Sequence, residues 1–235
     1  MKNERGKFII FEGLDGSGKS TQTKLLFKAL KKSGFKAVKI DFPQYGKKSA
    51  GLVEEYLAGK YGSAKEVGAK RASIFYACDR YDASFKIKKL LNKGVIVVSD
   101  RYVASNMGHQ GGKIKDKNKR SEFFKWLYNL EYNFFGIPVP DIAFVLETSP
   151  QLAYKLSGKI TDRLKKKRKE LYLGKKKRDL HEQDIDHLKD ALNSYAQVLE
   201  EFPEDYKAIK CIKDGELLSP EIIHKKIWEE VKKML

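Results

Sequence analysis

The stretch Phe8-Ile9-Ile10-Phe11-Glu12-Gly13-Leu14-Asp15-Gly16-Ser17-Gly18-Lys19-Ser20-Thr21 decides the fold of this chain. An apolar run typical of a buried strand is followed by Gly-x-x-x-x-Gly-Lys-Ser and then by a helical pattern that continues to Leu30. Strand, glycine-rich loop and helix in this order are typical of a phosphate-binding loop. We therefore expect a nucleoside triphosphate site here, and the alternative is an ordinary glycine-rich turn.

The glycines of this loop remove the Cβ atoms that would obstruct a tight turn, so that backbone N–H groups and the helix N-terminus can converge on anionic oxygens. Lys19 is expected to reach the β- and γ-phosphates, and the Ser20 hydroxyl to take a ligand position of Mg²⁺. The predicted triphosphate-binding residues are Gly13, Asp15, Gly16, Ser17, Gly18, Lys19, Ser20 and Thr21.

Length and composition fit one intracellular domain. The 235 residues can bury a single sizeable core, and no stretch resembles an interdomain linker. Met1–Lys7 is charged and precedes a short apolar run, so we expect no secretory signal, no membrane-spanning segment and a cytoplasmic location. Cys78 and Cys211 lack metal-ligand spacing, which favours buried, reduced thiols over a disulfide or a zinc site.

The chain is strongly basic, with 48 lysines and arginines against 31 acidic residues and a formal charge of +17. Much of the excess lies in Lys165–Lys169 and Lys175–Arg178. Such runs are often a solvated surface, and the functional alternative is the handling of phosphate groups. No RNA- or DNA-binding motif accompanies them, so we expect no nucleic-acid partner.

Strands and helices alternate along the whole chain. We expect helices at 20–32, 50–57, 66–91, 121–135, 180–201 and 219–234, another helix beginning at Ser149-Pro150, and strands at 36–40, 95–98, 141–146 and 207–212. The segment 66–91 contains no proline and is predicted to be one long helix. The alternation predicts an α/β fold, a doubly wound parallel sheet of about five strands in a single domain, 1–235.

Charged residues follow the strand 95–98 at the edge of the sheet where open α/β folds bind ligands. Asp100 is placed to hold the water shell of Mg²⁺, and its alternative role is a helix N-cap. The planar guanidinium of Arg101 suits phosphate oxygens, which it can bind in pairs.

Tyr76 and Arg80 lie one helical repeat apart and therefore share a face of the predicted helix. An aromatic ring beside a guanidinium can stack on a nucleobase and bond its edge. In the alternative, Tyr76 belongs to the core and Arg80 forms a surface ion pair with Asp79 or Asp82.

Four motifs occur in the order and spacing seen in thymidylate kinases, which are P-loop nucleoside monophosphate kinases: Glu12–Thr21, Phe42-Pro43-Gln44-Tyr45-Gly46, Phe75-Tyr76-Ala77-Cys78-Asp79-Arg80 and Asp100-Arg101-Tyr102-Val103-Ala104-Ser105-Asn106. Leu146–Pro150 resembles the family's fourth strand and turn, and Arg178–Glu182 resembles the end of its lid. The chain resembles this family over nearly its whole length. The Asp-Arg-Tyr stretch with Ser105 and Asn106 is the most specific part.

The resemblance implies Mg²⁺-dependent transfer of a phosphoryl group from ATP to dTMP, giving dTDP and ADP for dTTP synthesis, by a homodimer. Asp15 would contact the acceptor 3′-hydroxyl, Tyr76 would stack on thymine, and Arg80 would bond the base edge. The implied dTMP-binding residues are Asp15, Phe42, Tyr45, Tyr76, Arg80, Arg101, Ser105, Asn106, His109 and Asp179. The implied metal site comprises Ser20, Asp100 and Asp179.

A monophosphate acceptor brings an oxygen that is already ionised, so the reaction needs no general base and cations should dominate the site. Some family members carry an arginine in the phosphate loop, where this chain has Gly16-Ser17. We therefore expect a transition-state arginine from a lid at about 157–179, where Lys159, Arg163, Arg168 and Arg178 are all candidates. The predicted catalytic residues are Lys19, Arg101, Asp15, Arg163 and Arg178.

Three features leave alternatives open. His109 stands where the family often has a tyrosine, which affects the selection of deoxyribose. A deoxynucleoside kinase with Asp41 as its general base, or a nucleic-acid-binding ATPase that uses the basic runs, would also carry the glycine loop. The aromatic stretch Phe123–Tyr128 is a candidate for a dimer contact, and its alternative is a place in the core.

Overall fold

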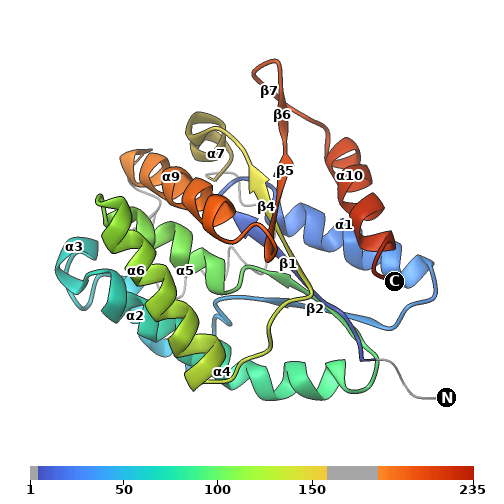
Figure 1. Cartoon of the computed structure of the whole chain (residues 1–235), viewed down its shortest axis with the longest axis horizontal. Helices are drawn as coiled ribbons and strands as arrows, with labels where there is room; N and C mark the ends of the chain where they lie inside the picture. The colour runs from blue at the N-terminus through green and yellow to red at the C-terminus, as the bar shows by residue number, and fades with distance from the viewer. Residues whose placement is uncertain (1–4, 158–184) are drawn as a thin grey trace.

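The computed structural model describes residues 5–157 and 185–235, and five strands of this part of the chain form one parallel sheet (Figure 1). They are β1 (Phe8–Gly13), β2 (Ala37–Asp41), β3 (Ile96–Asp100), β4 (Ile142–Glu147) and β5 (Tyr206–Lys210), in the order β2-β3-β1-β4-β5. Strand β1 is the middle strand of the five and pairs in parallel with both of its neighbours, β3 and β4. The phosphate loop therefore leaves the sheet at its middle.

Helices cover both faces of the sheet. Their bounds are α1 (Lys19–Lys32), η1 (Lys48–Ala50), α2 (Gly51–Leu57), α3 (Ala64–Val67), α4 (Ala69–Leu91), α5 (Val103–His109), η2 (Gly111–Lys113), α6 (Lys117–Tyr128), η3 (Asn129–Phe134), α7 (Pro150–Ser157), α9 (Ile185–Glu201) and α10 (Pro220–Lys232). A short hairpin of β6 (Ile212–Lys213) and β7 (Glu216–Leu217) precedes α10. The predicted doubly wound α/β fold is confirmed.

Alternate residues of β1 enter two different apolar clusters. Ile9 and Phe11 pack with Leu26 and Ile227, so α1 and α10 cover one face. Ile10 packs on the other face, in a cluster with residues of α4, α5 and α9. Because both faces are covered, all of β1 is buried, as its continuous apolar sequence indicates.

The predicted long helix over 66–91 is wrong in one respect. It is two helices, α3 and α4, separated at Gly68, whose φ of 76° and ψ of 168° interrupt the helical hydrogen bonding. Helix α3 begins with a capping box in which Ser63 and Glu66 bond each other's backbone N–H groups. A glycine accepts this positive φ without a Cβ clash.

The predicted helix at 121–135 begins earlier and ends differently. Asp116 caps the N-terminus of α6 by accepting a hydrogen bond from the Lys119 backbone. The last turns, Asn129–Phe134, form the wider π-helix η3. Helix α5 and the β6–β7 hairpin were not predicted, and the predicted helix start at Leu180 lies outside the described residues.

A third, smaller apolar cluster lies away from the sheet. Val53, Tyr56, Leu57, Val67 and Ala72 bring α2 and α3 against the start of α4. Tyr45, Tyr61, Phe75 and Tyr76 pack on this cluster. The loop after β2 and the first turns of α4 therefore share one support.

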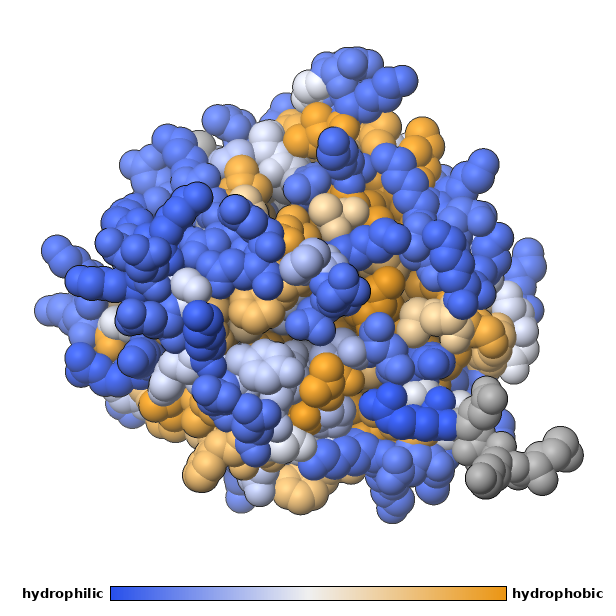
Figure 2. Space-filling model, in the orientation of Figure 1, coloured by the Kyte–Doolittle hydropathy of each residue, from blue (hydrophilic) through white to orange (hydrophobic). Residues whose placement is uncertain are grey.

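Hydrophilic residues cover most of the face shown in Figure 2, and of the two thiols expected to be buried only Cys211 is. Cys211 is buried, Cys78 is half-buried, and neither forms a disulfide. Within residues 5–157 and 185–235, no helix combines the length and the apolar character that crossing a membrane requires.

Candidate active site

The glycine loop joins the central strand to α1 as predicted. Gly13 has a φ of 128°, and a Cβ there would lie 2.7 Å from the carbonyl oxygen of Leu146 on β4. Gly18 has a φ of 94° but open space where a Cβ would be, so its conformation rather than crowding requires glycine. The two glycines therefore serve different needs, close strand packing and a left-handed turn into the helix.

Lys19 lies inside this loop and bonds the loop itself. Its Nζ donates to the carbonyl oxygens of Gly13 at 2.9 Å and Leu14 at 2.6 Å, and the residue is 6% exposed. Burial, and then the nearby Arg101, lower the pKa of Lys19 to about 8. The cation predicted to bind phosphate is therefore held in place by two carbonyl groups of the loop.

The Ser17 hydroxyl supplies a second sign of an anion site. It is buried, and its oxygen has no hydrogen-bond partner among the described residues. A buried hydroxyl usually has a partner, and a phosphate oxygen arriving in the loop would provide one. Ser20 is half-buried and Thr21 exposed at the start of α1, within the predicted triphosphate site.

Arg101 reaches from the end of β3 to the phosphate loop. Its Nη2 donates to Asp15 in a short ion pair, and its Nη1 donates to the Ser105 hydroxyl at 3.2 Å. Burial disfavours the charge, but nearby carboxylates, Asp15 foremost, hold the pKa of Arg101 above its ordinary value. Its backbone φ of 74° is rare for a residue with a side chain and is typical of functional sites.

His109 lies on the other side of the same guanidinium. Its Nε2 is 3.1 Å from Nη1 of Arg101, and because arginine donates, this nitrogen accepts and the imidazole is neutral. Burial, and then Arg101, lower the pKa of His109 well below its ordinary value. The ring also stacks on His187 of α9, with 5.7 Å between centroids. The His109 imidazole beside Arg101 is therefore neutral near pH 7.

Glu12 bonds residues next to Arg101, and the sequence reasoning gave it no role. It is fully buried and accepts hydrogen bonds from the Tyr102 backbone at 2.7 Å, the Ser105 hydroxyl at 2.6 Å and the Tyr195 hydroxyl at 3.3 Å. Burial raises the pKa of its carboxyl group. Glu12 thus ties β1 to α5 and α9, and a carboxylate within an apolar strand was the available signal.

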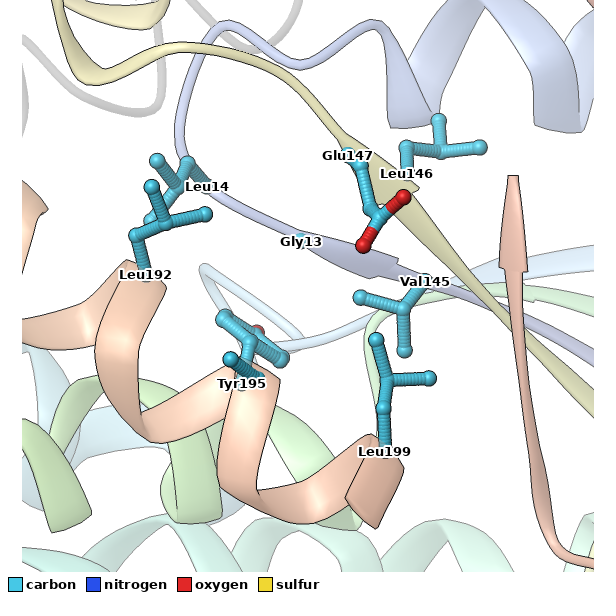
Figure 3. A pocket seen from close by; sticks show the side chains of 9 residues that line it. Gly13, Leu14, Val145, Leu146, Glu147, Leu192, Tyr195 and Leu199 are labelled. Carbon is cyan, nitrogen blue, oxygen red and sulfur yellow. The ribbon is translucent and has the colours of Figure 1, made fainter. Parts of the chain in front are cut away.

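A small cavity lies behind the phosphate loop, between the sheet and α9 (Figure 3). Its volume is about 30 Å³, and it is lined by Gly13, Leu14, Val145, Leu146, Glu147, Leu192, Tyr195, Ala196 and Leu199. This volume holds no more than one or two water molecules. The cavity is therefore too small for a nucleotide and belongs to the packing of α9 under the loop.

Asp100 ends β3, and its charge partly offsets the lowering of the Lys19 pKa that burial causes. Its alternative role as the N-cap of α5 is wrong, since Tyr102 occupies that position. Asp41 ends β2 and pairs in register with Asp100. The described residues contain no cluster of three or more ligating side chains, yet Mg²⁺ in phosphoryl-transfer sites commonly uses one or two protein oxygens plus substrate phosphates. Ser20 and Asp100 fit such a donor set.

Arg80 does not form the surface ion pair considered from the sequence. It is 1% exposed, and its Nε and Nη2 donate to the two carboxylate oxygens of Glu131 at 2.5 and 2.7 Å. Its Nη1 lies 3.3 Å from the carbonyl oxygen of Tyr102. The surface alternative with Asp79 or Asp82 is therefore wrong.

Asp79 instead holds the loop after β2. Its carboxylate accepts hydrogen bonds from the Gln44 backbone at 2.7 Å and from the Ser49 hydroxyl at 2.6 Å. Phe42, which is followed by a cis peptide bond to Pro43, is buried with its ring 5.7 Å from that of Tyr102. Two adjacent residues of α4 thus have different partners. Asp79 supports the loop after β2, and Arg80 bonds Glu131 of η3.

The remaining predicted acceptor residues lie on the loop after β2, on α4 and on α5. Tyr76 is half-buried, with its ring 6.4 Å from Tyr56, and Tyr45 is half-buried on the same cluster. Asn106 is 2% exposed, and its Nδ2 donates to the Ser73 carbonyl at 3.2 Å. Their contacts to a base stay predictions. Arg163, Arg178, Asp179, Lys159, Arg168 and the lid from residue 158 onward lie outside the described residues.

Comparison with known proteins agrees with this geometry. The sequence model of the thymidylate kinase family matches residues 11–227. The thymidylate kinase of Plasmodium falciparum is 33% identical over 154 residues, 66% of this chain and 67% of that protein. Human thymidylate kinase is 29% identical over 147 residues, 63% of each chain.

The fold has a solved counterpart as well. The structure of thymidylate kinase from Candida albicans superposes with a TM-score of 0.71 at 20% identity, covering 97% of this chain and 92% of that one. At this identity the likeness shows the fold alone. The sequence match spans the phosphate loop and the Asp100-Arg101-Tyr102 stretch and ends within the last helix, and on that ground the chain belongs to the thymidylate kinase family.

Proposed function

We propose that the residues at the carboxyl edge of β1 and β3 carry out the reaction of the family, in which ATP phosphorylates dTMP to dTDP. The reaction follows from family membership. The observation that supports this site is the contact between Arg101 and Asp15, which brings an arginine from one strand end to the loop that holds Lys19. A donor phosphate and an acceptor phosphate would meet between these cations.

The donor half is the glycine loop with Lys19. Backbone N–H groups at the start of α1 and the Lys19 ammonium would bind the β- and γ-phosphates in place of the carbonyl groups that Lys19 now bonds. Arrival of an anion favours the charged form of Lys19, whose pKa is about 8 in the ligand-free protein. The Ser17 hydroxyl would gain a partner at the same time.

The acceptor half is built around Arg101. Its guanidinium would exchange the Asp15 carboxylate for the acceptor phosphate, because a phosphate dianion is the stronger partner for a planar fork. Asp15, released from this contact, is then placed to accept a hydrogen bond from the acceptor 3′-hydroxyl. Tyr76 and Arg80 would recognise the base, with Ser105, Asn106 and His109 completing the wall.

Mg²⁺ would be held by Ser20 and Asp100 together with the phosphates. When bound, it neutralises phosphate charge and orients the transferring group. The protein itself aligns the two phosphates and stabilises the charge of the transition state through Lys19 and Arg101. No side chain is needed as a general base, since the attacking oxygen is already ionised.

The two alternative functions are not favoured. The family match replaces the deoxynucleoside kinase hypothesis, and Asp41 is one of a pair of strand-end aspartates rather than the single carboxylate there. The nucleic-acid-binding ATPase rested on basic runs that lie outside the described residues. A cytoplasmic location, with no nucleic-acid or membrane partner, stays a prediction.

A homodimer is proposed from the resemblance, and the exposed aromatic side chains support a particular surface for it. Tyr81, Phe85 and Phe134 are 42%, 60% and 81% exposed, and the Tyr81 ring lies 5.3 Å from that of Phe85. The stretch Phe123–Tyr128 is a weaker candidate, because Phe123, Phe124 and Leu127 are core residues. Light scattering of Phe85→Ser would reveal a monomer if this surface forms the dimer.

The direct test is a panel of nucleoside monophosphates assayed with ATP and Mg²⁺. We expect turnover of dTMP to exceed that of dCMP, dAMP and dGMP, and thymidine to remain unphosphorylated. Turnover of thymidine without turnover of dTMP would contradict the proposal and favour the deoxynucleoside kinase. Omission of Mg²⁺, with EDTA present, should abolish the reaction.

A further inference from the structure

The guanidinium of Arg80 is held by groups from two other parts of the chain. Glu131 lies in η3, 51 residues away, and both its oxygens are bonded. The carbonyl group of Tyr102, at the start of α5, takes a third bond. Arg80 is among the largest fully buried side chains, and Glu131 is 0% exposed. The orientation of the guanidinium is therefore fixed before any ligand arrives.

The donors that remain have a defined direction. An arginine carries five N–H donors in a planar fork. The bond pair to Glu131 uses the edge formed by Nε and Nη2, and Tyr102 takes one N–H of Nη1. The other N–H groups of Nη1 and Nη2 project from the end of the fork. A guanidinium end offers hydrogens alone, so it suits a carbonyl oxygen and repels an amino group.

Stability alone does not account for this pair. Two charges buried together lose hydration, and apolar residues of similar volume are often as stable or more so. What the pair provides, and an apolar contact does not, is one fixed direction for the donors. The geometry of η3 contributes to this, because its wide turn, closed by the Phe135 N–H to the Leu130 carbonyl at 2.9 Å, carries Glu131 into the interior.

The same arginine is coupled to the phosphate end of the site. The Tyr102 residue that accepts from Arg80 directly follows Arg101, and its own N–H is bound by Glu12 at 2.7 Å. Fixing Arg80 therefore also fixes the distance between a base-binding group and the acceptor-phosphate arginine. A monophosphate has to satisfy both at once.

We propose that Glu131 is a positioning residue for nucleobase selection: by holding Nε and Nη2 of Arg80, it presents the end of the guanidinium to a keto oxygen and so favours thymine over an aminopyrimidine. This inference rests on the proposed function. It assigns to η3 a task that no motif in the sequence indicated.

The test compares the wild-type protein with Glu131→Gln, using dTMP and dCMP as acceptors at saturating ATP. The glutamine keeps the volume but places an amide N–H₂ against one arginine donor, so the fork turns. We expect KM for dTMP to rise about tenfold to a hundredfold, kcat and the KM for ATP to change little, and the preference for dTMP over dCMP to fall by a similar factor. Circular dichroism establishes that the variant is folded.

Gln197→Leu is the matched control. It removes the acceptor of another buried arginine, Arg120 in the first turn of α6, whose Nε donates to Gln197 of α9 at 2.7 Å. We expect it to lower Tm and leave the dTMP preference unchanged. If Glu131→Gln fails to fold, Glu131→Asp decides, because it keeps the charge and withdraws the carboxylate by one methylene: a reduced preference supports the proposal, and an unchanged one overturns it.

The outcomes separate the two levels of inference. A folded Glu131→Gln protein with the KM and the preference of the wild type would overturn the role of Glu131 and leave the kinase assignment intact. A wild-type protein that does not phosphorylate dTMP would overturn both. Equal losses in kcat for dTMP and dCMP, with the preference retained, would also reject base positioning, since a purely structural defect affects both acceptors alike.

Discussion

The ion pair of Arg101 with Asp15 and the ion pair of Arg80 with Glu131 are held in opposite ways. The side chains of Arg101 and Asp15 are 16% and 31% exposed, whereas those of Arg80 and Glu131 are 2% and 0% exposed. Asp15 belongs to the glycine loop, where we propose that a nucleotide phosphate replaces it as the partner of Arg101. Glu131 belongs to a π-helix packed in the interior and bonds Arg80 with both oxygens.

In the proposed function, this difference corresponds to two roles, phosphoryl transfer for Arg101 and base recognition for Arg80. A cation that stabilises a transferring phosphoryl group has to release its resting partner, so a partly exposed carboxylate at the loop suits it. A cation that distinguishes one base from another has to keep one direction, so a buried partner suits it. Exposure of the partner, more than the presence of an ion pair, distinguishes the two roles.

The largest effect should come from removing the phosphate-binding cations. We expect Lys19→Ala and Arg101→Ala each to lower kcat by about 10²–10³-fold or more, because each cation stabilises charge that develops in the transition state. Steady-state assays with dTMP and ATP measure this. Lys28→Ala, an exposed lysine of α1, serves as the control and should retain wild-type turnover. Wild-type turnover in either site variant would refute the exchange of partners proposed for this region.

The recognition side should respond in KM rather than kcat. Tyr76→Ala removes the ring that is proposed to stack on the base, and we expect KM for dTMP to rise about tenfold to a hundredfold, on the scale of one lost stacking contact. Tyr76→Phe keeps the ring and should retain the wild-type KM. If Tyr76→Ala lowers kcat and leaves KM unchanged, Tyr76 acts in phosphoryl transfer and not in base recognition. The proposed division of roles between the two regions would then be wrong.

The sequence predicted the parts of the site that depend on local patterns and strand ends. The glycine loop is contiguous, and its strand, turn and helix are visible within Phe8–Leu30. Asp15 and Arg101 follow neighbouring parallel strands, β1 and β3, so their meeting follows from the sheet. The alternation of strands and helices along the chain likewise predicted the parallel α/β fold.

The parts that were missed depend on contacts across the fold. Glu131 is 51 residues from Arg80, and a π-helix leaves no periodic signal that would aim it inward. The break at Gly68 had a signal, since glycine weakens a helix interior, but the apolar periodicity around it outweighed that signal. Glu12 lies in an apolar strand, and its three donors come from the residue that caps α5, from α5 itself and from α9.

A smaller effect is expected at Asp79, which supports the loop after β2 from the same helix turn as Arg80. Asp79→Ala removes the acceptor of the Gln44 backbone and the Ser49 hydroxyl, so the loop that carries Tyr45 loses its anchor. We expect KM for dTMP to rise about threefold to tenfold, on the scale of about 1 kcal/mol for a lost hydrogen bond. Asp82→Ala, whose carboxylate reaches the Gln44 amide at 3.4 Å, is the control. If the two variants raise KM for dTMP equally, the negative charge of α4, and not the support of the loop, determines KM.

The smallest effect is a change in Tm, and its sign differs between the phosphate loop and the Arg80–Glu131 pair. Burial, and then Arg101, lower the pKa of Lys19 from its ordinary 10.5 to about 8. The unfolded chain therefore binds this proton more tightly than the folded chain, so below pH 8 the charge opposes folding, and the opposition disappears as the pH rises toward 10.5. Glu131→Gln should lower Tm, since it leaves Arg80 poorly paired, whereas Lys19→Met should raise it.

We expect Lys19→Met to raise Tm of the ligand-free protein by about 2–4 °C at pH 7, the shift that about 1 kcal/mol produces in a chain of this size. The gap should close between pH 8 and pH 10, because the wild-type lysine then becomes neutral in the folded state. Thermal unfolding across this pH range measures it, with Lys28→Met on the exposed side of α1 as the control. A gap that is absent at pH 7, or constant with pH, would mean that the Gly13 and Leu14 carbonyl groups fully compensate the buried charge, and that the empty phosphate loop stores no electrostatic penalty.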